Sequence, residues 1–226
     1  LRKAGVTHAV ILATDTDPSD VDRPEIQEWI KEAYMKGDLR FQIPLEKTVS
    51  IIKNSLRSPT HVTNRDAAEW AQDYPLQLIA FGSVNLSRSE DYVAGTLAKI
   101  EEYGFKGIKL LPFSQFFNPS ANDNIEMLMD YCSRTDTSVL CHTGCAAGVF
   151  EYPEFSLNSR PMLWEPVLKR YPDVKLVLAH FGAYSDMYPG IWFYEALELM
   201  RKFDNVYADL AAVTGLLSLE HITGEI

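Results

Sequence analysis

The sequence predicts an α/β fold built around a parallel β-sheet, and three observations support this prediction. Short apolar or β-branched runs recur along the 226 residues, and each is followed by a polar loop and an amphipathic stretch. The phrases AQDYPLQLIAFGSV and LKRYPDVKLVLAHFG repeat one design of helix, Tyr-Pro and strand, as tandem βα units do. Hydrophobic residues make up 46% of the chain, which is enough for one sizeable core.

The strands are expected where apolar runs have the length of a buried strand, over residues 7–13, 77–84, 107–111, 138–142, 175–180 and 205–210. Helices are expected where the apolar spacing is helical, over residues 24–35, 45–56, 65–74, 88–103, 124–135, 162–171 and 188–203. Asn64 and Asp123 are residue types that cap helix starts, and Gly104 is placed to end a helix. Pro75 and Pro172 end the helical pattern just before the next strand.

One long segment departs from this alternation. Residues from about 15 to 76, between the first two runs, hold up to three helical patterns and no expected strand. We expect this elaborated loop region to lie over one end of the sheet, where lids and substrate-binding segments are common. Because no low-complexity linker divides the chain, residues 1–226 are predicted to form a single domain.

Charge and composition argue against several classes of protein. The net charge of −10 disfavours binding to nucleic acid or to an anionic membrane surface. No apolar run approaches the ~20 residues of a membrane-spanning helix, and no signal-peptide pattern opens the chain, so we expect a cytoplasmic protein. The three cysteines form no C-x-x-C pair and are expected as reduced thiols. The stretch YPGIWFYEALELM is compatible with a homo-oligomer, with packing against the core as the alternative.

Two nearly identical phrases, VLCHTG at 139–144 and VLAHFG at 177–182, end two of the expected strands with a histidine. The carboxyl ends of parallel strands gather on one face, where the site is built. We therefore expect His142 and His180 to face one mouth, and Gly144 and Gly182 to let the chain turn sharply after them. Neutral imidazole binds divalent metals, which lower the pKa of bound water to about 7. The alternative is that both histidines only anchor loops.

Other strands also end near polar groups, namely Lys109 in GIKLLP, Asp209 in YADL and Asn85 in SVNL. Two imidazoles, an ammonium and a carboxylate at one mouth resemble a site for metal-assisted hydrolysis. Each has a structural alternative, with Lys109 as an ion-pair partner and Asp209 as a helix cap. Phe113, in the loop after Lys109, is a candidate wall of a substrate pocket, and packing against a helix is its alternative.

These residues also resemble a known family. The phrases GFKGIKLLP, VLCHTG, VKLVLAHFG and NVYADLA, in this order, resemble strands four to seven of the amidohydrolase superfamily, in particular its amidohydrolase 2 branch of metal-dependent hydrolases and decarboxylases. AGVTHAVIL and YPLQLIAFGSVNL resemble its second and third strands. The resemblance covers nearly the whole chain and implies a distorted (β/α)8 barrel, or TIM barrel, with one or two divalent metals at the mouth. Zinc is the expected metal, and manganese and iron are the alternatives.

Residue by residue, the resemblance implies roles for three side chains. His142 resembles the fifth-strand metal ligand, and His180 resembles the sixth-strand histidine that binds a second metal or orients substrate and attacking water. Lys109 falls on the fourth strand, where some relatives bear a carbamylated lysine, and it is a candidate catalytic residue. The family's first-strand H-x-H pair and last-strand aspartate have no counterpart here. We therefore expect the first and last barrel strands to be missing from this chain.

The predicted function is that of a metal-dependent hydrolase, in which metal-activated water attacks the carbonyl carbon of an amide, ester or lactone in a small-molecule substrate. A decarboxylase on the same scaffold is the alternative enzyme. A barrel that has lost its metal, and serves as a binding or assembly subunit, is the non-catalytic alternative. Arg160, in the loop after the fifth strand of the family, is a candidate for binding a substrate carboxylate, unless it lies at the surface. The other candidate substrate-binding residues are Lys109, Phe113 and Asp209.

Overall fold

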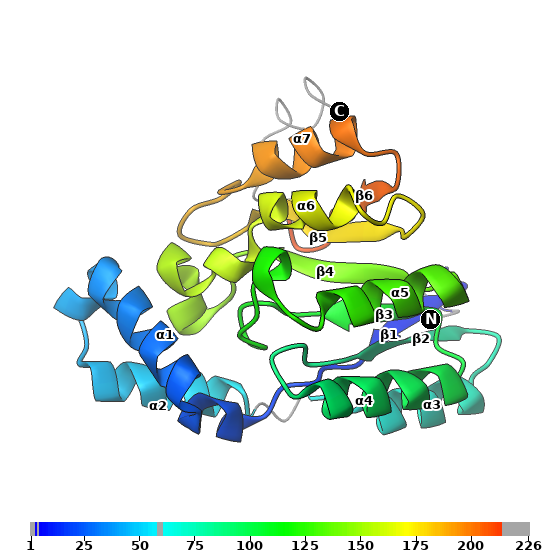
Figure 1. The fold of residues 1–226 in the computed structure, drawn as a ribbon, viewed down its shortest axis with the longest axis horizontal. Coiled ribbons are helices and arrows are strands. Elements are labelled where there is room, and N and C mark those ends of the chain that lie inside the picture. The colour runs from blue at the N-terminus through cyan, green and yellow to red at the C-terminus, as the bar shows by residue number, and fades with distance from the viewer. Residues whose placement is uncertain (1–2, 4, 58–60, 214–226) are drawn as a thin grey trace.

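The computed structural model describes residues 3, 5–57 and 61–213, and its centre is a six-stranded sheet (Figure 1). The strands are β1 (Ala9–Leu12), β2 (Leu78–Ser83), β3 (Gly107–Leu110), β4 (Ser138–Gly144), β5 (Leu176–Tyr184) and β6 (Val206–Ala208). Neighbouring strands pair in parallel, in the order in which they follow along the chain. Each strand lies on one of the predicted apolar runs, so the predicted α/β class is confirmed.

The α-helices of the described residues are α1 (Pro24–Lys36), α2 (Leu45–Ser55), α3 (Asn64–Asp73), α4 (Glu90–Glu102), α5 (Ile125–Thr135), α6 (Glu165–Leu168) and α7 (Phe193–Lys202). Each overlaps a predicted helix, but α6 and α7 are shorter than expected. A 3₁₀ helix, Pro161–Trp164, precedes α6, and Gly190 has a φ of 79°, which an α-helix cannot continue through. Gly104 follows α4 with a φ of 69°, as predicted. None of these helices is long and apolar enough to cross a membrane.

Two predicted helix caps are wrong. Asn124, rather than Asp123, is the N-cap residue of α5. The cap of α3 is Thr63, whose hydroxyl accepts a hydrogen bond from the Asp66 backbone N–H in a capping box. Asn64 instead turns its side-chain amide to the sheet, where it bonds both backbone groups of Ser83 in β2. The sequence places three polar residues together here, and only the position of β2 decides which one caps the helix.

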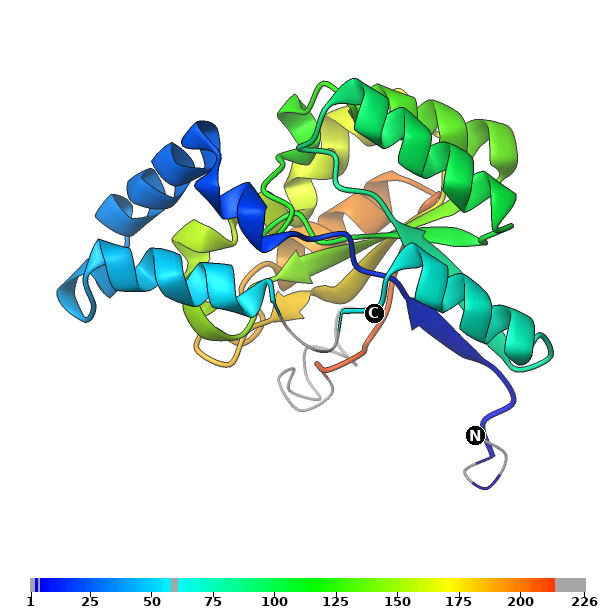
Figure 2. The ribbon, with the colours of Figure 1, turned by 90° about the horizontal axis from the view of Figure 1, so that it is seen from below.

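The sheet curls into part of a barrel, with helices on its outer face (Figures 1 and 2). Residues such as Ile108 and Val139 point outward and are fully buried in the main hydrophobic core. The strand register places Val10 beside Ile79 on the inner face, and these side chains are 49% and 37% exposed. Tyr207, on β6 at the opposite edge, is also 49% exposed. A sequential strand order with an outer layer of helices is the pattern of a (β/α)8 barrel, of which these strands form a part.

The long segment between β1 and β2 divides into two parts. Helix α3 packs on the barrel beside β2, whereas α1 and α2 stand away from the sheet (Figure 1). We call residues 18–56 the helical lobe; it also contains the 3₁₀ helices Pro18–Asp22 and Asp38–Phe41. Its core combines Ile30 and Ile52 with Phe150 and Phe155. The last two come from the segment after β4, which holds the 3₁₀ helices Gly148–Glu151, Pro153–Phe155 and Leu157–Ser159. The lobe therefore packs beside the carboxyl end of β4.

Candidate functional site

The two histidines of the repeated phrase lie side by side at the carboxyl end of the sheet. His142 is in β4 and His180 is in the adjacent β5, and their ring centroids are 4.9 Å apart. Both strands run on past the histidines, to Gly144 and Tyr184, so the predicted strand ends at positions 142 and 180 are wrong. The pairing continues because the backbone N–H of Cys145 donates to the Tyr184 carbonyl at 2.6 Å.

An irregularity in the β4–β5 ladder accompanies the histidines. The register shifts after His142 pairs with Ala179, so that β5 carries extra residues. Thr143 holds the shifted strands together, because its hydroxyl donates to the Ala179 carbonyl at 2.5 Å and accepts from the Gly182 N–H at 2.9 Å. Thr143 is fully buried. Thr143, between His142 and Gly144, therefore links β4 to β5, a role that the sequence did not predict.

Both glycines of the repeated phrase are needed by the backbone. Gly144 has a φ of 105°, and a Cβ there would lie 2.5 Å from the Tyr184 carbonyl oxygen. Gly182 has a φ of 69°, and its Cβ would lie 2.5 Å from the Trp192 carbonyl oxygen. Because both obstacles are main-chain atoms, no side-chain movement makes room. Gly144 is the last residue of β4, whereas Gly182 lies inside β5, so the sharp turn into a loop that was expected at Gly182 is wrong.

His142 is buried in the neutral form that binds metals. Its Nε2 lies 2.8 Å from the carbonyl oxygen of Cys145. A carbonyl only accepts hydrogen bonds, so Nε2 carries the proton and Nδ1 keeps the lone pair of the neutral ring. Burial, assisted by the nearby charge of Lys109, holds the pKa of His142 well below its usual value. The ring is therefore neutral at pH 7.

His180 has the opposite tautomer and an unusual backbone. Its Nδ1 lies 2.7 Å from the Ala211 carbonyl oxygen, so Nδ1 carries the proton and Nε2 keeps the lone pair. Burial lowers the pKa of His180 as well. Its φ is 65°, in the left-handed region that non-glycine residues rarely occupy. The Tyr184 ring, with its centroid 5.1 Å away, packs against the imidazole.

Lys109 is a buried cation beside the two histidines. It lies in β3 and is 5% exposed. Its ammonium forms no hydrogen bond or ion pair within the described residues. Burial lowers the pKa of Lys109 to about 8, and the nearby Cys141 thiol and Asp209 carboxylate only partly offset this shift. The ammonium is thus available to a bound molecule and close to its titration range at neutral pH.

Aromatic side chains connect the histidines to the helical lobe. The Phe113 ring lies edge-on to both His142 and Phe150, with centroid distances of 4.8 Å in each case. Trp29 of α1 contacts Phe116 in the same loop, at 5.6 Å. Phe113 and Phe116 both pack on the core of the lobe. Phe113 therefore contacts a candidate metal ligand while it also packs on the lobe.

The remaining sequence candidates have different surroundings. The Oδ1 atom of Asp209 accepts a hydrogen bond from the His180 backbone N–H at 2.9 Å, so the structure brings Asp209 next to His180. Arg160 instead pairs with Glu195 in α7, with an Nε–Oε1 distance of 3.1 Å, and its side chain is 43% exposed. Asn85 is fully buried, and its amide donates to Asp20 at 3.0 Å. Asn85 thus anchors the start of the helical lobe, where Asp20 lies.

Two buried polar residues join the loops around the site and were not predicted. Gln115 is fully buried, and its amide bonds to the carbonyls of Asp15 and Val84, the Ser83 hydroxyl and the Leu111 N–H. Glu151 is 7% exposed and accepts from the Ser185 hydroxyl at 2.7 Å and the Met187 N–H at 3.3 Å. Neither lies in a recognisable motif, because their partners are distant in the sequence.

The two histidine nitrogens are of the kind that binds a metal, but two protein ligands are fewer than a metal site usually has. Each histidine donates its N–H to a backbone carbonyl and keeps one basic nitrogen, as metal-ligating histidines usually do. Within residues 3, 5–57 and 61–213, no three His, Cys, Asp or Glu side chains lie close enough to hold an ion. Catalytic zinc sites use about three protein ligands. A metal at the two histidines therefore needs further donors.

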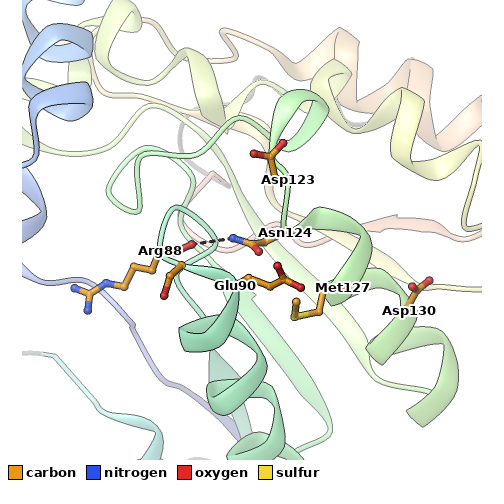
Figure 3. A pocket seen from close by; sticks show the side chains of 7 residues that line it. Arg88, Glu90, Asp123, Asn124, Met127 and Asp130 are labelled. Carbon is orange, nitrogen blue, oxygen red and sulfur yellow. Dashed lines mark hydrogen bonds between the residues drawn. The ribbon is translucent and has the colours of Figure 1, made fainter.

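A surface hollow of about 650 Å³ lies apart from these residues, between the first turns of α4 and α5 (Figure 3). Its lining consists of Arg88, Ser89, Glu90, Asp123, Asn124, Met127 and Asp130. The Asn124 amide donates to the Arg88 carbonyl at 2.8 Å and joins the two helix starts. The Arg88 guanidinium points away from the hollow, and it bonds Asp20 at 3.0 Å. None of the candidate site residues lines this hollow.

Solved structures similar to this chain share a barrel fold. An uncharacterised TIM-barrel protein from Bordetella bronchiseptica is 17% identical, with a TM-score of 0.54, over 92% of this chain and 76% of its own. A probable 2-pyrone-4,6-dicarboxylic acid hydrolase from Acinetobacter baumannii, with citric acid bound, is 18% identical, with a TM-score of 0.50. The match covers 73% of this chain and 57% of the hydrolase. A 5-carboxyvanillate decarboxylase from Novosphingobium aromaticivorans, complexed with manganese and 4-hydroxy-3-methoxy-5-nitrobenzoic acid, is 15% identical, with a TM-score of 0.50. The match covers 88% of this chain and 51% of the decarboxylase.

These likenesses confirm the fold as a distorted, partial (β/α)8 barrel, and the chain spans only about half of the last two structures. No curated protein matches the sequence. A family described as Amidohydrolase matches residues 53–224, which is most of the chain and includes both histidine phrases. Together with the parallel strand order, this match confirms the resemblance seen in the sequence, and the protein belongs to the amidohydrolase family.

Proposed function

We propose that this protein is a metal-dependent hydrolase of amides, esters or lactones, with His142 and His180 as metal ligands. The observation that carries the proposal is the pair of neutral imidazoles on adjacent strands, 4.9 Å apart, each with one nitrogen fixed by a backbone carbonyl. Such fixed, uncharged rings lose little entropy and no proton when they bind a cation. Membership of the amidohydrolase family supports the same reaction class.

When bound, a divalent metal supplies Lewis-acid charge that lowers the pKa of water to about 7. Zinc suits the imidazole donors, and manganese and iron are the alternatives. The manganese in the decarboxylase from Novosphingobium aromaticivorans shows that a protein of similar fold holds one of these ions. His142 and His180 would hold the ion, and further donors would complete its coordination.

Lys109 would bind and orient the substrate. Its buried ammonium has no protein anion within hydrogen-bond distance among the described residues, so a substrate oxygen would gain a charge-assisted hydrogen bond there. With a pKa of about 8, its Nζ can also give up or take a proton near neutral pH. Phe113, edge-on to His142, would form an apolar wall that limits the approach of solvent.

A decarboxylase is the second candidate, and the buried charge of Lys109 is the observation that favours it. This ammonium has no ion-pair partner in the described part of the chain, and it would hold a substrate carboxylate at the same place where it would hold a carbonyl oxygen. Hydrolysis adds water across a bond, whereas decarboxylation releases carbon dioxide. Product analysis with carboxylated substrates therefore separates the two reactions.

Metal content is the first test. We would measure zinc, manganese and iron by elemental analysis of the natural full-length protein and of its His142→Ala, His180→Ala and His8→Ala variants. His8 is the matched control, because it is exposed and bonds only to Thr7 among the described residues. We expect about one or two equivalents of metal in the wild type and the control, and a loss of metal in His142→Ala. A metal-free wild-type protein would exclude the hydrolase and leave a non-catalytic barrel.

A further inference from the structure

The backbone around His180 is held in a conformation that the chain does not adopt by itself. His180, Phe181 and Gly182 have φ values of 65°, 52° and 69°, three consecutive left-handed residues at the carboxyl end of β5. Only glycine enters this region without a steric penalty. A histidine and a phenylalanine there need a contact that compensates for it.

Asp209 supplies that contact where the β5–β6 ladder ends. The ladder runs regularly up to this point, with the Leu176 N–H donating to the Asn205 carbonyl and the Asp209 N–H donating to the Leu178 carbonyl. The His180 N–H comes next on β5, and its partner is the side chain of Asp209, whose Oδ1 accepts at 2.9 Å. A carboxylate oxygen thus replaces the next main-chain acceptor.

The same oxygen atom also fixes the imidazole. Asp209 Oδ1 accepts a second hydrogen bond from the Ala211 N–H, at 3.0 Å, in a turn that closes over residues 209–211. This turn presents the Ala211 carbonyl to the His180 ring, where Nδ1 donates at 2.7 Å. Through one oxygen atom, Asp209 is connected to both the backbone and the ring of His180.

The other neighbours of the ring do not replace this connection. Tyr184 and His142 pack against His180 with their rings, at centroid distances of 5.1 Å and 4.9 Å, and ring contacts do not choose between two imidazole tautomers. Lys109 acts on His180 only through its charge. Among the described residues, the Ala211 carbonyl alone provides a hydrogen-bond partner for the ring.

We propose that Asp209 is a positioning residue, which holds His180 in the Nδ1–H tautomer and so presents Nε2 to the metal. The role of Nε2 rests on the proposed function, whereas the tautomer does not. This assignment differs from direct substrate binding, because Oδ1 of Asp209 is already engaged by two backbone N–H groups.

The test is the tautomer of His180 in the metal-free, full-length protein, read from long-range ¹H–¹⁵N spectra of the labelled histidine rings, with His180→Gln to assign the signal. We expect the Nδ1–H form in the wild type and in Asp209→Asn, whose amide oxygen still accepts both N–H groups. Asp209→Ala should show a mixture of both tautomers. Asp204→Ala, which removes an exposed carboxylate from the segment before β6, is the control and should match the wild type.

A pure Nδ1–H signal in folded Asp209→Ala would overturn the proposal, as would loss of that form in Asp209→Asn. If the alanine variant does not fold, Asp209→Leu, which also lacks the acceptor oxygen, takes its place with the same expected result. Manganese titration gives a second readout, and we expect Asp209→Ala to weaken binding by about 10–100-fold and Asp209→Asn by less than 10-fold. A wild type in the Nδ1–H form that binds neither zinc, manganese nor iron would contradict the proposed function and leave the positioning role standing.

Discussion

At the scale of single residues, the candidate site contains the buried ammonium of Lys109, which forms no ion pair among the described residues. Because the pKa of Lys109 falls from 10.5 to about 8 on folding, the unfolded chain binds more protons between these values. The free energy of unfolding should therefore rise as the pH rises from about 8 to 10.5. Below pH 8, Lys109 is charged in both the folded and the unfolded state, and the full cost of burying its charge lowers the stability. At about 1.36 kcal/mol per pKa unit, this cost amounts to roughly 3 kcal/mol. We expect Lys109→Met to be more stable by about this amount at pH 7, measured by urea unfolding with a chelator present.

Lys106→Met serves as the control, since Lys106 lies just before β3 and is exposed. It should leave both the stability and its pH dependence as in the wild type. An equal pH dependence in the wild type and in Lys109→Met would show that another group causes the rise.

At the scale of elements, Gly144 lets β4 and β5 approach each other where a Cβ would meet main-chain atoms. Gly144→Ala would place its Cβ 2.5 Å from the Tyr184 carbonyl oxygen at a φ of 105°, so both the backbone and the ladder must shift. We expect it to lower the free energy of unfolding by about 2–4 kcal/mol. Gly104→Ala is the matched control, with a φ of 69° and open space around the added methyl, and should cost about 1–2 kcal/mol.

Urea unfolding measures the free energy of unfolding of both variants, and an unchanged m-value shows that only the stability has changed. Equal losses would mean that left-handed backbone strain alone, and not the close approach of β5, accounts for the glycine in the first histidine phrase.

At the scale of the whole molecule, the helical lobe and the barrel meet at the aromatic residues beside the site. Trp29 of α1 contacts Phe116 at 5.6 Å and Phe155 at 6.3 Å. We expect Trp29→Ala to cost about 2–4 kcal/mol and to speed hydrogen exchange in residues 24–55 and 149–155 before it does so in β3 to β5. Trp70→Ala on α3, where the side chain is 47% exposed, should not change exchange in the lobe.

Hydrogen exchange followed by mass spectrometry distinguishes these segments. If the lobe and the strands exchanged together in Trp29→Ala, the lobe and the barrel would unfold as one cooperative unit, and the separate core of the lobe would carry no independent stability.

The sequence by itself determined the alternation of strands and helices, because hydrophobic periodicity and turn residues act over a few neighbouring positions. It also placed His142, His180 and Lys109 near the carboxyl ends of their strands, since parallel strands bring these ends together. Contacts between distant segments lay beyond this reasoning. The cap of α3, the pairing of Arg160 with Glu195 and the links made by Thr143 depend on which segments meet in space.

Only the tertiary structure decided the protonation and orientation of the site. The tautomers of His142 and His180 follow from the carbonyls of Cys145 and Ala211, and the lowered pKa of Lys109 follows from its burial. These properties arise from low-dielectric surroundings and from single hydrogen bonds, which no local pattern encodes. Local sequence pattern therefore predicts which polar residues lie near the carboxyl ends of the strands, whereas the fold decides which of their atoms keep a lone pair.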